Sequence, residues 1–272
     1  GSDYPGTGWT SDAAEMPIPV TVGGEDMTVT AISSIAPSFV AAGTTATGNN
    51  ASVAPGNPAG LQVGDLKVIA AAIRNSGTGF PLAPNGWSQI GLFGNLGIFG
   101  RYHETGDAAP TVAFSGGVAN ADTIAQVAAF RGVSLRVFSD SQYQLNASAQ
   151  NIAYPSCATL GPNTLVLYIG WKQDDWTSVA TIASATEIGE PSSTAGDDAG
   201  LVWDYRIQTT PANIGSGSFT VTGGASAISR GAVIVLDGTV QRMTVTRSVN
   251  GVVKSHAIGA TVSLARPAAI AL

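Results

Sequence analysis

Charge is scarce in this chain of 272 residues: Asp, Glu, Lys and Arg make up 11% of it, well below the roughly 25% usual in soluble domains. The formal net charge of -6 is the balance of 18 acidic and 12 basic residues. The basic residues form no cluster able to follow a phosphate backbone, so nucleic acid is not an expected partner. No apolar run reaches the roughly 18 residues of a membrane span, so we also expect no insertion into a membrane.

Cysteine and histidine are just as scarce. The single cysteine, Cys157, excludes an internal disulfide and a cysteine-based zinc site, and its apolar, strand-like surroundings favour a small buried side chain. His103 and His256 are the only histidines, and a Ser-His-Asp arrangement needs one as its base. We expect His103 on the outward face of a strand and His256 in a solvated or packing role on a hairpin. With no GxxxxGK[ST] phosphate loop either, the chain is predicted to have no catalytic residue and not to be an enzyme.

Helix signals are missing as well. The alanine-rich segment 119–130 reads equally well as a helix or a strand, and no other segment is a convincing amphipathic helix. Instead, 34 Gly and 14 Pro punctuate short runs rich in Val, Ile, Thr, Phe and Tyr. This spacing is typical of an all-β fold.

An internal repeat organises the middle of the chain. Four strings recur in the same order: GDLKVIAAAIR and NTLVLYIGWKQ, WSQIG and ATEIG, GIFGRYH and GLVWDYR, QVAAFRG and AVIVLDG. Residues 60–132 and 160–238 are therefore predicted to be two copies of one strand unit. Alternation places Tyr102 and Tyr205 on the buried face, with Asp204 and Arg206 on the opposite face. Packing the two copies together buries both apolar faces, giving a jelly-roll-like β-sandwich of about ten strands in residues 38–238.

The two ends of the chain read as a separate, smaller domain. MPIPVTVGGEDMTVTAIS near the start holds two strand-like runs, and the end holds two or three more, with Asn250-Gly251 as a hairpin signal. Neither piece is long enough for its own core. Residues 1–37 and 239–272 are predicted to pair into one β domain of about five strands, split by the insertion of residues 38–238.

The end segments carry a resemblance. MTVTAIS followed by MTVTRSVNGVVKSHAIGATVSLARPAAIAL, with WTSDAAEMPIPVTVGG before them, resembles the C-terminal region of minor tail proteins of phages infecting actinobacteria, where the two parts are nearly contiguous. Residues 38–238 resemble a β-sandwich module of phage virion proteins through GLQVGDL, APNGW and ADTIAQVAAFRGV. The resemblance implies a fragment of a bacteriophage tail protein, located in the virion and acting at the exterior of the host cell. Its implied partners are other virion proteins and further copies of itself.

One loop, GWKQDDWTS, is the candidate binding surface. A tryptophan face beside carboxylate and amide groups suits a sugar, so Trp176, Asp174, Asp175 and Gln173 are the candidate ligand-binding residues; the alternative is that Trp176 packs as a lid over the end of the sandwich. The acidic pairs in this loop and at residues 197–198 could be solvated charge or a calcium site. No DxDxDG spacing supports calcium, so no metal and no other cofactor is predicted.

The leading interpretation is a phage tail structural protein that contributes to host attachment by contact with a receptor or a cell-surface glycan, without catalysis. Two alternatives belong to other classes: a carbohydrate-binding module of a larger cell-wall-acting protein, and a capsid decoration or head-fibre protein.

Overall fold

The computed structural model of the chain describes residues 13–49, 52–74, 79–116, 120–137, 142–159, 161–194, 197–247, 249–256 and 262–264. These residues form an all-β protein whose one helical element is η1 (Ala13–Glu15), so the predicted fold class is confirmed. Among them, no helix has the length and apolar character needed to cross a bilayer.

The chain divides into two compact units: a small unit of residues 1–35 and 239–272, and a large unit of residues 36–238. The boundaries expected from the sequence, 37/38 and 238/239, differ from these by two residues at the first and by none at the second. Residues 1–12 and 265–272 of the expected small domain lie outside the described residues.

In the small unit, the two ends of the chain share one antiparallel sheet. Its strand order is β22-β2-β1-β23, with β1 (Ile18–Val22), β2 (Glu25–Ser34), β22 (Gln241–Thr246) and β23 (Val262–Leu264). Val20, Met27 and Val29 lie in its core. The sheet has four described strands where about five were expected. Asn250 and Gly251 do form a turn, but the described residues 252–256 after it form no strand, so the hairpin predicted there is wrong.

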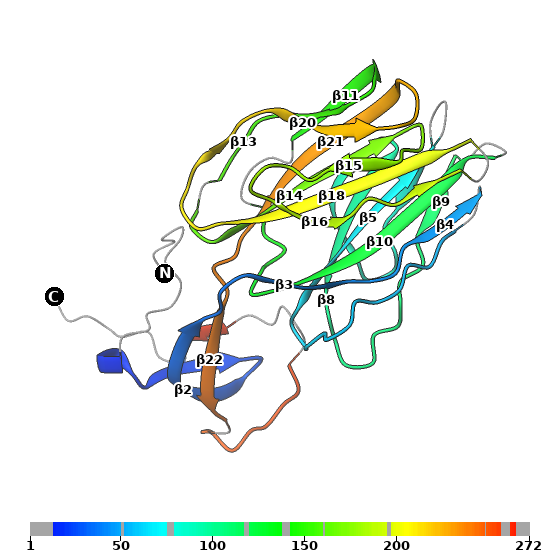
Figure 1. Cartoon of the computed structure of the whole chain (residues 1–272). Helices are drawn as coiled ribbons and strands as arrows, with labels where there is room; N and C mark the ends of the chain where they lie inside the picture. Colours follow the sequence, from blue (N-terminus) through cyan, green and yellow to red (C-terminus); the bar gives the residue numbers. More distant parts are fainter. Residues whose placement is uncertain are drawn as a thin grey trace. The chain divides into compact units, whose positions relative to one another are not determined.

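The large unit contains two copies of one arrangement (Figure 1). The first copy comprises β3 (Ser38–Ala42), β4 (Ala46–Asn49), β5 (Leu66–Ile73), β6 (Phe80–Leu82), β7 (Ser88–Phe93), β8 (Leu96–Tyr102), β9 (Ala113–Ser115) and β10 (Asp122–Arg131). The second copy comprises β11 (Gln142–Ala149), β12 (Ile152–Tyr154), β13 (Cys157–Ala158), β14 (Thr164–Lys172), β15 (Ser178–Ala180), β16 (Thr186–Gly189), β17 (Ser192–Ser193), β18 (Ala199–Gln208), β19 (Asn213–Ile214), β20 (Gly217–Thr222) and β21 (Ala227–Leu236).

Each copy has a main sheet and a smaller outer sheet. The main sheets have the orders β3-β10-β5-β8-β7 and β11-β21-β14-β18-β16, and the outer sheets are β6-β9 and β12-β20-β15, with β13-β19 as a further pair. Early and late strands thus alternate in both main sheets, as in a jelly roll. The jelly-roll-like topology expected for the two copies together is therefore present within each copy.

The repeat extends further than the matched strings. Each copy begins with a strand that pairs with its last strand, β3 with β10 and β11 with β21, before the region where the sequence shows similarity. Within the copies, the central strands keep one register. Phe130 lies opposite Leu66 in the first copy and Leu236 lies opposite Leu165 in the second, as the aligned strings predict.

The alignment of β8 with β18 is wrong by two residues. Tyr102 lies opposite Leu66, and the residue opposite the matching Leu165 is Ile207, not Tyr205. A shift of two residues leaves every side chain on its original face of the sheet. Both tyrosines accordingly pack against the same core, as expected, although they are not equivalent.

That core lies between the two main sheets. It is built from both copies, with Val68, Ile98 and Phe130 from the first and Leu167, Trp203 and Ile234 from the second. A hydrogen bond of 2.7 Å from the Trp203 indole N–H to Gln126 Oε1 crosses between the copies within it. The predicted packing of one copy against the other is present.

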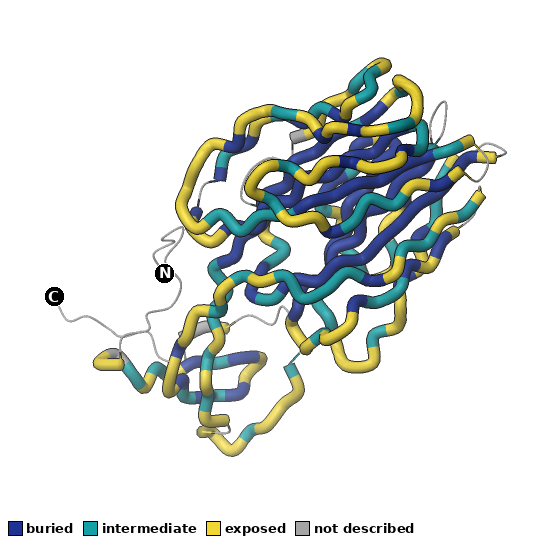
Figure 2. The backbone as a smooth tube through the Cα atoms, viewed as in Figure 1, coloured by how far each residue is buried: buried dark blue, intermediate teal, exposed yellow. Residues whose placement is uncertain are grey.

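The opposite faces of the main sheets are covered too. The outer sheets and their loops form two further cores against β5 and β14, and both strands are buried along their whole length (Figure 2). Asp204, expected on a face away from the core, is fully buried in this second layer. The covering layer was not predicted because its strands are short.

Candidate functional site

Trp176 does not offer an exposed binding surface. Its side chain is only 6% exposed and belongs to the core under the outer sheet of the second copy. A Cβ on Gly200 would lie 2.1 Å from the Trp176 ring, so the ring packs directly on the backbone of β18. The indole N–H donates to the carbonyl of Glu190 at 3.0 Å. Of the two roles considered for Trp176, the burial supports the packing lid.

The acidic residues expected near Trp176 do come together. Carboxylate oxygens of Asp174, Asp175 and Asp198 lie within 4.8 Å of one another, each half-buried. Lys172 is fully buried with its Nζ 3.9 Å from Asp174 Oδ2, and burial lowers the pKa of its ammonium. Asp174 also accepts a hydrogen bond from the Ala225 N–H. These contacts tie Asp174 to the end of β14 and to the loop between β20 and β21, and the Lys172 ammonium lies beside the cluster.

Gln173, the fourth residue expected in the binding surface, is half-buried at the end of β14. Its backbone N–H donates to the Ile228 carbonyl at 2.9 Å, which holds the start of the loop to β21. The loop thus has a structural part in linking strands.

A pocket lies elsewhere in the second copy, between the outer face of the main sheet and the outer strands. It has a volume of about 470 Å³. Tyr154 and Tyr168 are largely buried and lie deep in it. The lining residues that are exposed at its mouth are Ala180, Thr181, Ala183, Asn213, Gly215, Ser218 and Thr220. Hydroxyl and amide groups therefore surround an aromatic base.

Arg206 is the one charged residue among the described residues that line this pocket. It is half-buried on β18, and its Nε is buried without a hydrogen-bond partner. No hydrogen bond or ion pair joins its guanidinium to another described residue. Burial raises the pKa values of Tyr154 and Tyr168, so both keep their hydroxyl protons at neutral pH.

Asp204 holds one wall of the pocket in place. Its Oδ2 accepts the N–H of Ile182, a lining residue, at 2.7 Å. Burial raises the pKa of Asp204 to about 6, with the neighbouring charges of Glu187 and Glu190 acting in the same direction. The carboxyl group thus lies beneath the loop and does not line the pocket.

Two residues of the first copy are larger than the residues that match them in the second copy. Lys67 is buried, with its Nζ 5.4 Å from the centre of the Trp87 ring. The matched residues of the second copy are the smaller Val166 and Ala185. Val166 and Ala185 pack in the core under the outer sheet of the second copy and are not among the described residues that line the pocket.

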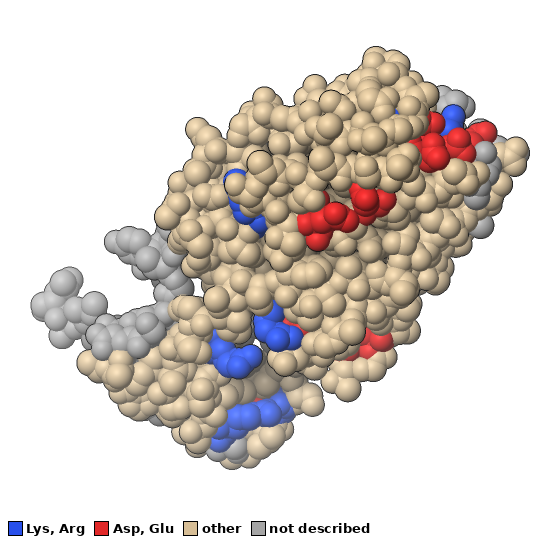
Figure 3. Space-filling view, viewed as in Figure 1, with Lys and Arg blue, Asp and Glu red and all other residues tan. Residues whose placement is uncertain are grey.

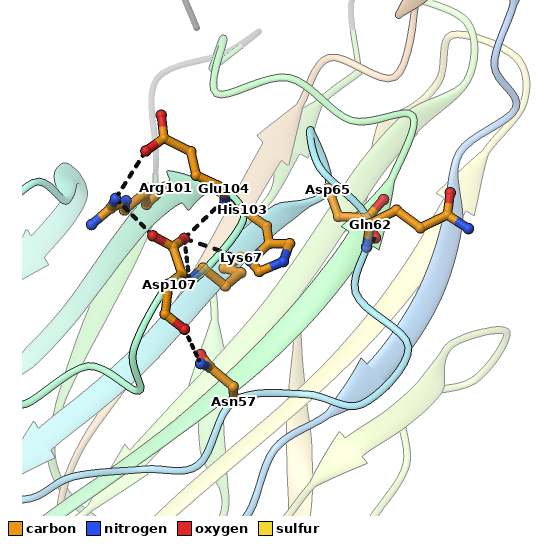
Figure 4. A network of polar contacts seen from close by, with 8 residues as sticks. All are labelled: Asn57, Gln62, Asp65, Lys67, Arg101, His103, Glu104 and Asp107. Atoms are coloured by element: carbon orange, nitrogen blue, oxygen red, sulfur yellow. Dashed lines mark hydrogen bonds and ion pairs between the residues drawn. The ribbon is translucent and has the colours of Figure 1, made fainter. Parts of the chain in front are cut away.

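The two copies also treat one arginine differently. Arg101 lies opposite Lys67 in the first copy as Arg206 lies opposite the matching valine in the second. Asp107 accepts hydrogen bonds from Lys67 Nζ at 2.8 Å, Arg101 Nη2 at 2.9 Å and the Glu104 N–H at 3.0 Å (Figure 4). Burial raises the pKa of Asp107, but these bonds outweigh it and the net pKa is lowered. In the first copy the arginine is thus neutralised by the protein itself.

Both histidines have structural partners. His103 Nδ1 lies 3.5 Å from Asp107 Oδ2, and His256 Nε2 lies 2.9 Å from Glu25 Oε2 in the small unit. The sequence alignment paired His103 with Arg206. In the structure Arg206 matches Arg101 instead. The two-residue error in the alignment of β8 with β18 hid the fact that both copies have an arginine at this position.

No family model, curated protein or solved structure matches this chain.

Charged side chains form only a few small groups on the face of the molecule in Figure 3, as the composition predicts.

Proposed function

We propose that this chain is a structural module of a bacteriophage tail that binds a saccharide of the host cell surface through the pocket of its second copy, without catalysing a reaction. The observation that carries the proposal is the pocket itself. Two tyrosine rings form its floor, and hydroxyl and amide groups lie around its opening. The phage assignment comes from the resemblance of the end segments to minor tail proteins.

The size and lining of the pocket support a small polar ligand. Its volume of about 470 Å³ falls within the roughly 300–1,000 Å³ of most ligand sites. Asn213, Ser218 and Thr220 offer donors and acceptors for sugar hydroxyls. Tyr154 and Tyr168 supply apolar ring surface together with one hydroxyl each.

The lining gives no support for hydrolysis. Glycoside hydrolysis commonly uses two carboxyl groups on either side of the scissile bond, and no carboxylate is among the described residues that line the pocket. We therefore propose that the pocket binds the saccharide and does not hydrolyse it.

A blocking substitution tests it. Ala183 is exposed at the mouth, so Ala183→Trp should fill the pocket without disturbing a core. Ala109, exposed in the first copy and outside the pocket, gives the matched control Ala109→Trp. We expect the wild type and Ala109→Trp to co-sediment with isolated actinobacterial cell walls, and Ala183→Trp to remain in solution at an unchanged melting temperature. A wild type that never sediments, or an Ala183→Trp variant that sediments normally, would refute the proposal.

The same pocket is compatible with a carbohydrate-binding module of a larger cell-wall-acting protein. Labelled antibody on intact phage particles separates the two: tail labelling supports the tail module, head labelling supports a decoration protein, and unlabelled particles support the enzyme-associated module.

A further inference from the structure

We infer that the ligand of this pocket carries a negatively charged group, a carboxylate or a phosphate, which binds the guanidinium of Arg206. The ligand class is thus an acidic saccharide. This inference rests on the proposed saccharide-binding function and adds the chemical character of the sugar.

The first reason is the state of Arg206 itself. Arginine can donate five hydrogen bonds in a fixed planar arrangement that fits a carboxylate or a phosphate. Here the Nε is buried without a partner, and the side chain lines an open pocket. Buried polar groups in folded proteins are normally hydrogen-bonded. A ligand oxygen in the pocket would provide the missing acceptor.

The second reason is the internal comparison. The matching Arg101 binds Asp107 Oδ1 at 2.9 Å and Glu104 Oε2 at 3.4 Å. The first copy therefore places carboxylates beside this arginine, and the second copy keeps the arginine but leaves a pocket in front of it. An acidic ligand in the second copy would stand where the Asp107 carboxylate stands in the first.

The third reason is the charge around the pocket. The hydroxyls of the two tyrosines, Ser218 and Thr220 and the amide of Asn213 can each donate and accept, so they suit polar groups in general. The nearest carboxyl group on β18, Asp204, already accepts the N–H of Ile182 and lies beneath the lining. Among the described lining residues Arg206 is the one charged group and no carboxylate is present, so the lining favours a negatively charged group on the ligand.

The test uses neutral and acidic polysaccharide fractions from one actinobacterial cell wall, separated by anion exchange and titrated into the whole protein by calorimetry. We expect the acidic fraction to bind. The affinity for the neutral fraction should be lower by about tenfold or more, as the loss of a charge-assisted hydrogen bond implies. Arg206→Gln should lose that preference, whereas Arg206→Lys should retain part of it because the charge remains. Arg242→Gln, a change of the same charge at an exposed residue of the small unit, should bind as the wild type does.

Chemical treatment of the acidic fraction identifies the group. If reduction of carboxyl groups abolishes binding, the charge is a carboxylate; if dephosphorylation abolishes it, the charge is a phosphate. Equal or tighter binding of the neutral fraction overturns this inference but leaves saccharide recognition standing. Binding of neither fraction overturns both. An Arg206→Gln variant that melts like the wild type and keeps its preference for the acidic fraction also overturns the inference.

Discussion

Replacement of Trp176 by alanine should lower the stability of the large unit strongly and leave saccharide binding by the folded protein intact. The ring is 6% exposed and packs on Gly200, so its loss leaves a cavity that costs about 3–5 kcal/mol. The indole hydrogen bond to the Glu190 carbonyl adds about 1 kcal/mol. The sum of roughly 4–6 kcal/mol corresponds to a fall in melting temperature of about 8 °C or more for a unit of this size.

Urea unfolding followed by circular dichroism measures this effect without depending on the fluorescence of the removed ring. Trp176→Phe is the matched comparison, because it keeps most of the packing and removes only the indole donor; it should cost about 1–2 kcal/mol. Trp176 does not line the pocket. An alanine variant with an unchanged unfolding midpoint that fails to bind cell walls would show that Trp176 contacts the ligand, and the burial argument would be refuted.

Three further substitutions test the fold. The hydrogen bonds of Glu25, above all with Arg247, hold the pKa of its carboxyl well below its usual value near 4.5. The stabilisation that Glu25 gives the folded small unit is therefore present above that pH and lost as pH falls. Glu25→Gln should destabilise the small unit at neutral pH and make its stability depend less on pH under acid conditions, as measured by hydrogen exchange. Burial raises the pKa of Asp204 from 3.8 to about 6, which disfavours the folded state increasingly from about pH 4 to above pH 6. The shift corresponds to about 3 kcal/mol at most. The stability difference between Asp204→Asn and the wild type should therefore shift in favour of the variant from pH 4 to pH 8, and a difference that does not change with pH would contradict the assignment. Tyr205 stacks on Phe39 at 4.9 Å, and Tyr205→Ala should cost about 3 kcal/mol in urea melts; a cost below about 1 kcal/mol would mean that its ring is not part of the core.

The repeat in the large unit could be predicted because the longest strands are also the most similar between the copies. β5 and β14 are buried along their whole length, so both copies need apolar residues at nearly every position, and this leaves a strong signal in the sequence. The short strands of the outer sheets leave little signal. β13 and β19 have two residues each, too few for alternation to be recognised.

The error in β8 and β18 has a simple physical cause. Alternation repeats every two residues, so an alignment displaced by two satisfies the same pattern of buried and exposed positions. Pairing with neighbouring strands removes the ambiguity. β7 and β16 bulge at the aligned Ile90 and Ile188, and on that register Gly100 in β8 and Tyr205 in β18 lie opposite equivalent residues.

The pocket could not be predicted from the sequence for a related reason. Part of its lining comes from β15 and β19, which have three and two residues, and such short strands leave no periodic pattern in the sequence. The polar loop around Trp176 was predicted as the binding surface instead. Composition cannot distinguish a loop that folds its tryptophan inward from one that exposes it, because that depends on a contact with Gly200 in a distant strand.

The two faces of each main sheet are under different packing constraints. The inner faces form one shared core, so a change in either copy must suit the other copy as well. The outer faces belong to separate cores and can change independently. This accounts for the pair Lys67 and Val166, which share a register position but differ in size and charge. A duplicated jelly roll can thus hold an internal ion network in one copy and not in the other, and the arginine present in both copies is then, on the inference proposed above, available in the second copy to a group from outside the protein.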